Sequence, residues 1–79
     1  PILYVYRRWG KSGLKESTLV IVAPPDDYGR SFTFHATLTP GTASPEKEDI
    51  ILSVVLELRG HKVEESTIER ALRYWLEGV

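Results

Sequence analysis

The residues of this 79-residue sequence that could contact phosphate groups and bases are concentrated near its start. Between positions 7 and 15 there are four basic residues and no acidic residue. Lys and Arg side chains contact phosphates, and aromatic faces stack on unpaired bases. Three aromatic residues lie within or directly before this segment. The sequence therefore predicts nucleic-acid binding by Arg7, Arg8, Lys11, Lys15, Tyr4, Tyr6 and Trp9.

Residue types that support catalysis or metal binding are few and scattered. His35 and His61 lie on a predicted strand and in a predicted loop, without the spacing of a zinc site. The tripeptide Gly10-Lys11-Ser12 matches the end of a Walker loop, but Val5 occupies the position of the first glycine that this loop needs. The sequence therefore predicts no enzyme, no metal and no cofactor. An active site built at a subunit interface around either histidine is the remaining alternative.

Composition predicts one folded domain over residues 1–79. Ten basic and 11 acidic residues give a net charge of −1, and 42% of the residues are hydrophobic, which argues against disorder. Residues 1–40 have five basic and three acidic residues (net +2), whereas residues 41–79 have five and eight (net −3). The sequence pI near 6.1 is low for a dedicated nucleic-acid-binding domain, so protein interaction stays an alternative.

Missing residue types predict the environment of the protein. The sequence contains no Cys, Met, Asn or Gln, and it is rich in Glu, Lys and Arg. This pattern is typical of hyperthermophilic proteins and predicts a thermophilic source with high thermal stability. No segment has the ~20 apolar residues that span a bilayer, and the first apolar residues precede the basic ones, opposite to a signal peptide. We therefore expect a cytoplasmic protein without membrane contact.

Alternating and continuous apolar residues predict three strands, at 2–9, 17–23 and 30–39. A loop with two glycines separates the first pair, and a turn at 24–29 separates the second. Along the third strand, the side chains that face outward are expected to be Thr33, His35 and Thr37. These residues are possible contacts for a ligand on that face.

Capping residues and apolar spacing predict two helices, at 45–59 and 66–77. Ser44 is a typical N-cap, Pro45 suits the first helical position, and acidic residues follow near the positive end of the helix dipole. The first helix has one narrow polar stripe and ends near Arg59 and Gly60. Residues 66–69 match a capping box for the second helix.

The expected fold class is α+β, with a three-stranded antiparallel meander followed by two helices packed on one sheet face. The other face would stay uncovered and would include the outward-facing residues of the first and third strands. Because a sheet cannot cover all of the apolar first helix, we also expect a homo-oligomer, formed through helix 45–59 or the outer sheet face. An assembly subunit is thus the alternative to a nucleic-acid-binding module, for which DNA and RNA both remain open.

The order of a strand at 31–38 and two helices is similar to that of the ribbon-helix-helix DNA-binding family. Residues 68–76 look like the second helix of that family. The resemblance would imply a homodimer whose paired strands enter the major groove, with Thr33, His35 and Thr37 facing bases. Some 30 residues with two additional strands precede this part of the chain, and the outward positions lack the Arg, Lys, Asn or Gln that read bases best. We therefore do not assign the sequence to that family.

Overall fold

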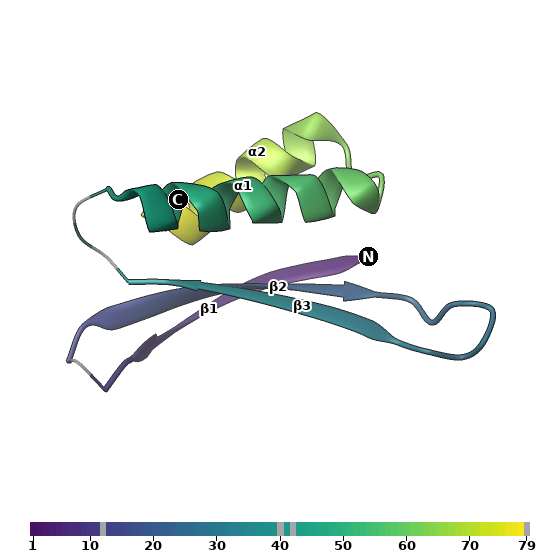
Figure 1. The fold of residues 1–79 in the computed structure, drawn as a ribbon, viewed down its shortest axis with the longest axis horizontal. Helices are drawn as coiled ribbons and strands as arrows, with labels where there is room; N and C mark the ends of the chain where they lie inside the picture. Colours follow the sequence, from purple (N-terminus) through teal and green to yellow (C-terminus); the bar gives the residue numbers. More distant parts are fainter. Residues whose placement is uncertain (12, 40, 42, 79) are drawn as a thin grey trace.

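The computed structural model describes residues 1–11, 13–39, 41 and 43–78. Within these residues, the strands β1 (Ile2–Trp9), β2 (Lys15–Ala23) and β3 (Phe32–Leu38) form one antiparallel sheet in the order β1-β2-β3. The helices α1 (Pro45–Gly60) and α2 (Glu65–Glu77) follow and lie together on one side of the sheet (Figure 1). The predicted α+β class and β-β-β-α-α order are confirmed.

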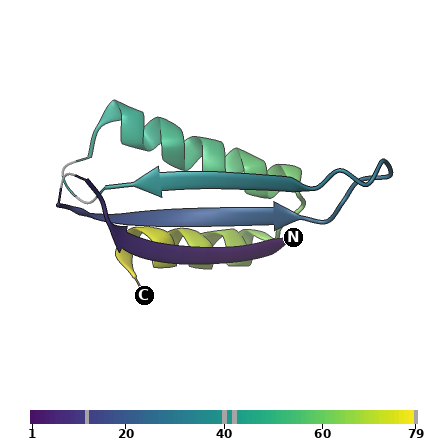
Figure 2. The ribbon, with the colours of Figure 1, turned by 90° about the horizontal axis from the view of Figure 1, so that it is seen from below.

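The two helices cover different strands. Helix α1 packs over β3, and α2 packs over β1 and β2, so both edges of the sheet are covered on this side (Figure 2). The core lies between these layers and consists of apolar side chains from both. Its most deeply buried members, all at most 1% exposed, are Leu19, Ile21, Val54, Leu58 and Trp75. The opposite side of the sheet has no second layer among the described residues.

Strand β2 is longer than the sequence indicated. It begins at Lys15 instead of Ser17, because Lys15 and Glu16 pair with Trp9 and Arg8 across the hairpin. Strand β3 is shorter than the predicted 30–39. The hairpin loop after β1 is closed by two backbone hydrogen bonds, from Gly10 N to Leu14 O at 2.8 Å and from Gly13 N to Gly10 O at 3.0 Å.

Helix α1 starts as predicted, and Lys47 N donates to the N-cap oxygen of Ser44 at 3.3 Å. The capping box predicted for the second helix is wrong. Helix α2 begins at Glu65, so Ser66 is already inside its first turn, and the N-cap residue Glu64 makes no side-chain cap hydrogen bond. The earlier start places the Glu65 carboxylate near the positive end of the helix dipole and within 2.8 Å of the Arg59 guanidinium.

Candidate nucleic-acid interface

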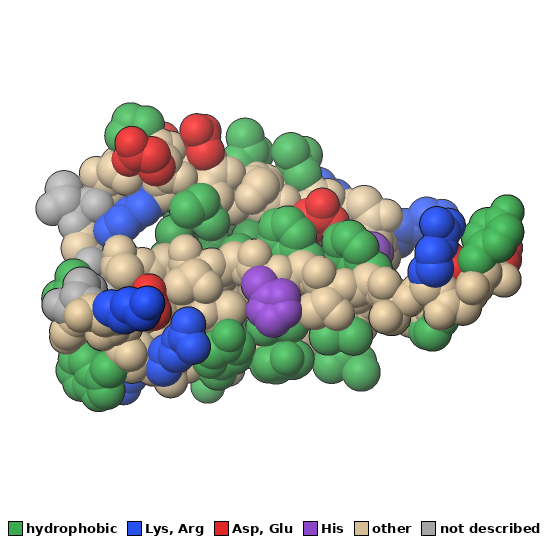
Figure 3. Space-filling model, turned by 60° about the horizontal axis from the view of Figure 1, so that its bottom comes forward, with side chains coloured by type: hydrophobic (Ala, Val, Ile, Leu, Met, Phe, Trp, Pro, Cys, Tyr) green, Lys and Arg blue, Asp and Glu red, His purple; other side chains and the backbone are tan. Residues whose placement is uncertain are grey.

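The uncovered side of the sheet, called the outer face from here on, consists of every second residue of the strands. Its members are Ile2, Tyr4, Tyr6, Arg8, Glu16, Thr18, Val20, Val22, Thr33, His35 and Thr37. Figure 3 looks at this side obliquely: hydrophobic side chains follow its lower border, where β1 lies. Lys and Arg side chains lie at the end with the β1–β2 hairpin, called the hairpin end from here on, and again at the other end near the β2–β3 loop. The structure thus joins an aromatic border and a basic end on one surface.

Two tyrosines form the centre of the aromatic border. Tyr4 and Tyr6 are 48% and 37% exposed, and their ring centroids lie 6.4 Å apart with an angle of 30° between the ring planes. Strand β1 positions them, because residues two apart in a strand point to the same face. Arg8 follows at the next outward position of β1 and is also exposed. Tyr4, Tyr6 and Arg8 thus occupy successive outward positions of β1, and we call the two rings the tyrosine column.

The centre of the outer face is buried, although none of the described helices or strands packs against it. Val20 is fully buried and Thr18 is 2% exposed, so the neighbouring side chains shield the middle strand. The hydroxyl groups of Thr18 and Thr37 form a hydrogen bond of 2.8 Å across β2 and β3. Thr37 lies beside the predicted contacts Thr33 and His35, and all three are exposed. The predicted polar strand face is therefore on the same surface as the tyrosine column.

A hollow of about 540 Å³ lies at the hairpin end of this surface, next to Arg8. Arg8, Trp9 and Lys11 line it together with Gly10 and Glu16. The Arg8 Nε and Glu16 Oε1 atoms are 3.7 Å apart. A side chain at Gly10 would meet Glu16, because an added Cβ would lie 2.8 Å from Glu16 Cδ. The contact is with the flexible end of the Glu16 side chain, which could move aside. Three of the predicted binding residues, Arg8, Trp9 and Lys11, thus line one concave site.

Arg7 does not belong to this surface. It points to the helix side of the sheet, where its guanidinium donates to the backbone oxygen of Tyr74 and lies 5.0 Å from the centre of the Tyr74 ring. A cation at this place is favourable, because the last carbonyl groups of α2 form the negative end of its dipole. Arg7 therefore attaches α2 to β1, and we remove it from the set of ligand-contacting residues.

Trp9 and Lys15 also take helix-side positions in the register, but they lie at the exposed end of the hairpin. The Lys15 ammonium is 5.9 Å from the centre of the Trp9 ring, and Trp9 is 72% exposed. Lys15 also lines a cavity of about 460 Å³ that opens between the sheet and the ends of the helices. Lys15 can therefore reach a ligand that continues past Arg8 and around the hairpin, and Trp9 also lines the hollow beside Arg8.

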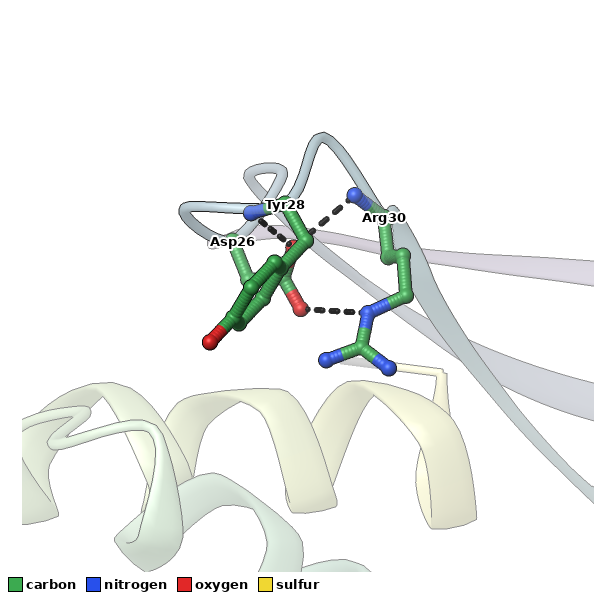
Figure 4. Close-up of polar contacts among 3 residues, drawn as sticks. All are labelled: Asp26, Tyr28 and Arg30. Carbon is green, nitrogen blue, oxygen red and sulfur yellow. Dashed lines mark hydrogen bonds and ion pairs between the residues drawn. The ribbon is translucent and has the colours of Figure 1, made fainter.

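The loop between β2 and β3 presents an aromatic and a basic side chain that the sequence interpretation omitted. Tyr28 is 83% exposed, and the Arg30 guanidinium lies 5.0 Å from the centre of its ring. Asp26 organises both residues: its Oδ1 accepts from the backbone N–H groups of Tyr28 and Arg30, each at 2.9 Å, and its Oδ2 accepts from Arg30 Nε at 2.9 Å (Figure 4). In the sequence, the spacing of Asp26, Tyr28 and Arg30 directly after two prolines is the signal that could have indicated this arrangement.

These contacts give the loop a pH dependence. The backbone N–H of Arg30 is the largest cause that lowers the pKa of the Asp26 carboxyl group, followed by the backbone N–H of Tyr28 and the Arg30 side chain. A lowered pKa means that the loop contacts are complete above the ordinary carboxyl range and are lost as the pH falls through the folded-state pKa.

We expect Asp26→Ala to release the loop at neutral pH without unfolding the sheet, because all its contacts are local and exposed. Amide hydrogen exchange of Tyr28 and Arg30 should accelerate, while the exchange of β2 residues stays unchanged. In the unaltered protein, NMR signals of the same two amides should shift only at acidic pH. Unchanged exchange in Asp26→Ala would show that the carboxylate does not organise this loop.

The histidines lie apart from one another in the fold. His35 is on the outer face, whereas His61 follows α1, with its Nε2 3.7 Å from Glu57 Oε2 and its ring 5.2 Å from that of Phe32. No group of three or more His, Cys, Asp or Glu residues that could hold a metal ion lies together in the described ranges of the chain. No helix formed by the described residues is long and apolar enough to cross a membrane.

Comparison of the chain with protein-family models, with curated proteins and with solved structures gave no match in any of the three.

Proposed function

We propose that this protein binds single-stranded nucleic acid on the outer face of its sheet. The observation that supports this function most directly is the pair of half-exposed rings, Tyr4 and Tyr6, side by side on the uncovered face. Their centroids are 6.4 Å apart, which suits two bases of an extended strand better than the closely stacked bases of a duplex. Base stacking on aromatic side chains is the common basis of single-strand recognition.

The second support is the position of the cations. Arg8 continues the tyrosine column, and Lys11 and Lys15 lie beyond it on the hairpin, so a strand on the rings would run toward positive charge. Lys and Arg residues that neutralise phosphates make binding salt-dependent. The outward positions of β3 are Thr and His, which read base edges less well than Arg, Asn or Gln. This favours a sequence-tolerant single-strand binder over a reader of the major groove.

The first experiment is a fluorescence-anisotropy titration with short labelled single- and double-stranded DNA and RNA at low and high salt. We expect saturable binding to single strands. With three phosphates neutralised, the slope of log affinity against log salt is about −2, so a fourfold rise in salt weakens binding roughly 20-fold. Absence of saturable binding to any single strand at low salt would refute the proposed function.

A charge-matched pair of variants locates the site. Lys11→Glu/Lys15→Glu and Arg70→Glu/Arg73→Glu each replace two positive charges by two negative ones, which changes the net charge from −1 to −5. Only the first pair is on the hairpin, because Arg70 and Arg73 are exposed on α2. We expect the hairpin variant to lose binding and the helix variant to retain it. Equal losses would indicate a general charge effect instead of a site.

A further inference from the structure

The exposed side of α1 has a composition that is unusual for a solvent-facing helix surface. Leu52 and Leu56 are 55% and 58% exposed, although they lie on a regular helix that already buries Val54 and Leu58 against the sheet. The two leucines are one helical turn apart and therefore form a single apolar patch. Figure 3 shows hydrophobic side chains along the upper border of the molecule, where α1 lies, with acidic side chains toward one end.

The patch belongs to a longer, regularly spaced row. Positions 45, 49, 52, 56 and 59 follow alternating steps of four and three residues, which is the spacing of the contact positions in a helix pair. We call this row, Pro45, Asp49, Leu52, Leu56 and Arg59, the helix seam. All five residues are exposed, whereas the buried residues of α1 lie on the opposite side of the helix.

The helix seam is complementary to itself when two copies run antiparallel. Position 54 lies midway between Leu52 and Leu56 and also midway between Asp49 and Arg59. A two-fold axis can pass between the two helices at the level of position 54. Each seam residue of one copy then faces the position of the second copy that is equally far from 54 on the other side, as a closed dimer requires. Leu52 then meets Leu56 of the second copy, and Asp49 meets Arg59 of the second copy. A parallel pair would place Asp49 against the same carboxylate, which is repulsive.

The rest of α1 supports the same orientation. Its first turn contains Glu46, Lys47 and Glu48, with a net charge of −1, so the antiparallel arrangement brings this negative end near Arg59 of the second copy and not near a second negative end. Arg59 is oriented by Glu65, which accepts from its Nε at 2.8 Å and from its Nη2 at 3.4 Å. A guanidinium has five N–H donors, so three remain for a second carboxylate.

We propose that the protein forms a symmetric homodimer through the helix seam of α1, paired antiparallel with the α1 of a second copy. This inference does not depend on nucleic-acid binding, since α1 and the outer face lie on opposite sides of the sheet. Such a dimer leaves both outer faces free and turns them away from each other. Each dimer therefore presents two separate tyrosine columns.

Sedimentation over a range of protein concentrations tests the dimer. We expect twice the chain mass of 9.0 kDa at low micromolar concentration. The variant Leu52→Lys/Leu56→Lys should sediment as a monomer throughout the range, because it places like charges at the centre of the seam. Leu14→Lys/Leu76→Lys is the matched control, with two leucines that are 49% and 48% exposed outside the seam, and it should stay dimeric. A monomeric unaltered protein, or a monomeric control, would refute the proposal.

The orientation has its own test. In Leu52→Lys/Leu56→Glu, antiparallel packing brings each lysine opposite a glutamate of the second copy, whereas parallel packing brings like charges together. We therefore expect this variant to dimerise more than the double-lysine variant at low salt and to lose the difference at high salt. If the two variants are equally monomeric at low salt, the antiparallel seam is wrong. Circular dichroism of each variant confirms that α1 remains folded.

Discussion

Replacing Trp75 with alanine is expected to remove much of the free energy of unfolding of this protein. Trp75 is 1% exposed and is the largest fully buried side chain. Its Nε1 donates to Ser17 O at 3.0 Å, and its own backbone oxygen accepts from Ser17 Oγ at 2.7 Å. Truncation of a buried Trp costs about 3–5 kcal/mol. A domain of this size has a total stability of about 4–12 kcal/mol.

The second tryptophan provides a matched control for that change. Trp9 is 72% exposed, so Trp9→Ala should change the free energy of unfolding by no more than about 0.5 kcal/mol. Urea unfolding followed by far-ultraviolet circular dichroism measures the free energy of unfolding of both variants. Heating the unaltered protein with the same detection tests the predicted high thermal stability. Similar losses for the two variants would contradict the assignment of Trp75 to the core.

The largest effect on the proposed function is expected from the tyrosine column. If each ring stacks on one base, each contributes about 1–3 kcal/mol, so Tyr4→Ala/Tyr6→Ala should weaken single-strand binding by about 30-fold or more. Most of this loss should persist at high salt, because stacking does not release counterions. Anisotropy titration at two salt concentrations separates this effect from that of the hairpin lysines.

Phenylalanine at the same positions keeps the rings and removes only the hydroxyl groups. We expect Tyr4→Phe/Tyr6→Phe to bind nearly as well as the unaltered protein. Since the tyrosines also help to shield Val20, thermal unfolding of both variants must accompany the titrations. A folded alanine variant with unchanged affinity would remove the tyrosine column from the site.

The sheet and most of its outer face were predictable from the sequence, because strand alternation is a local property. Alternation alone places Tyr4, Tyr6 and Arg8 on one side of β1 and Arg7 on the other. It does not indicate what Arg7 contacts, since its partner Tyr74 lies 67 residues away in the chain. From the sequence alone, Arg7 therefore cannot be distinguished from the other members of the basic segment.

Two other features could not be read reliably from local patterns. The capping box at 66–69 competes with an earlier helix start at Glu65, and the pairing of Glu65 with Arg59, a tertiary contact, favours the earlier one. The exposed pair Tyr28 and Arg30 lies in a segment whose composition indicates only a turn. The Asp26 carboxylate organises this loop by accepting hydrogen bonds from the backbone N–H groups of Tyr28 and Arg30. These hydrogen bonds can be identified only when the path of the backbone is known.

The contacts of Arg7 and Ser17 with α2 join the first two strands to the last helix of the fold. A ribosome makes the whole sheet before it makes α2, so the apolar helix-facing side of the sheet stays without its full cover during that interval. Local hairpins can form early, but closing a loop of 58 residues between Ser17 and Trp75 must wait for the end of the domain. The fold is therefore completed only after synthesis of the domain, and truncation before Trp75 would leave a sheet prone to aggregation.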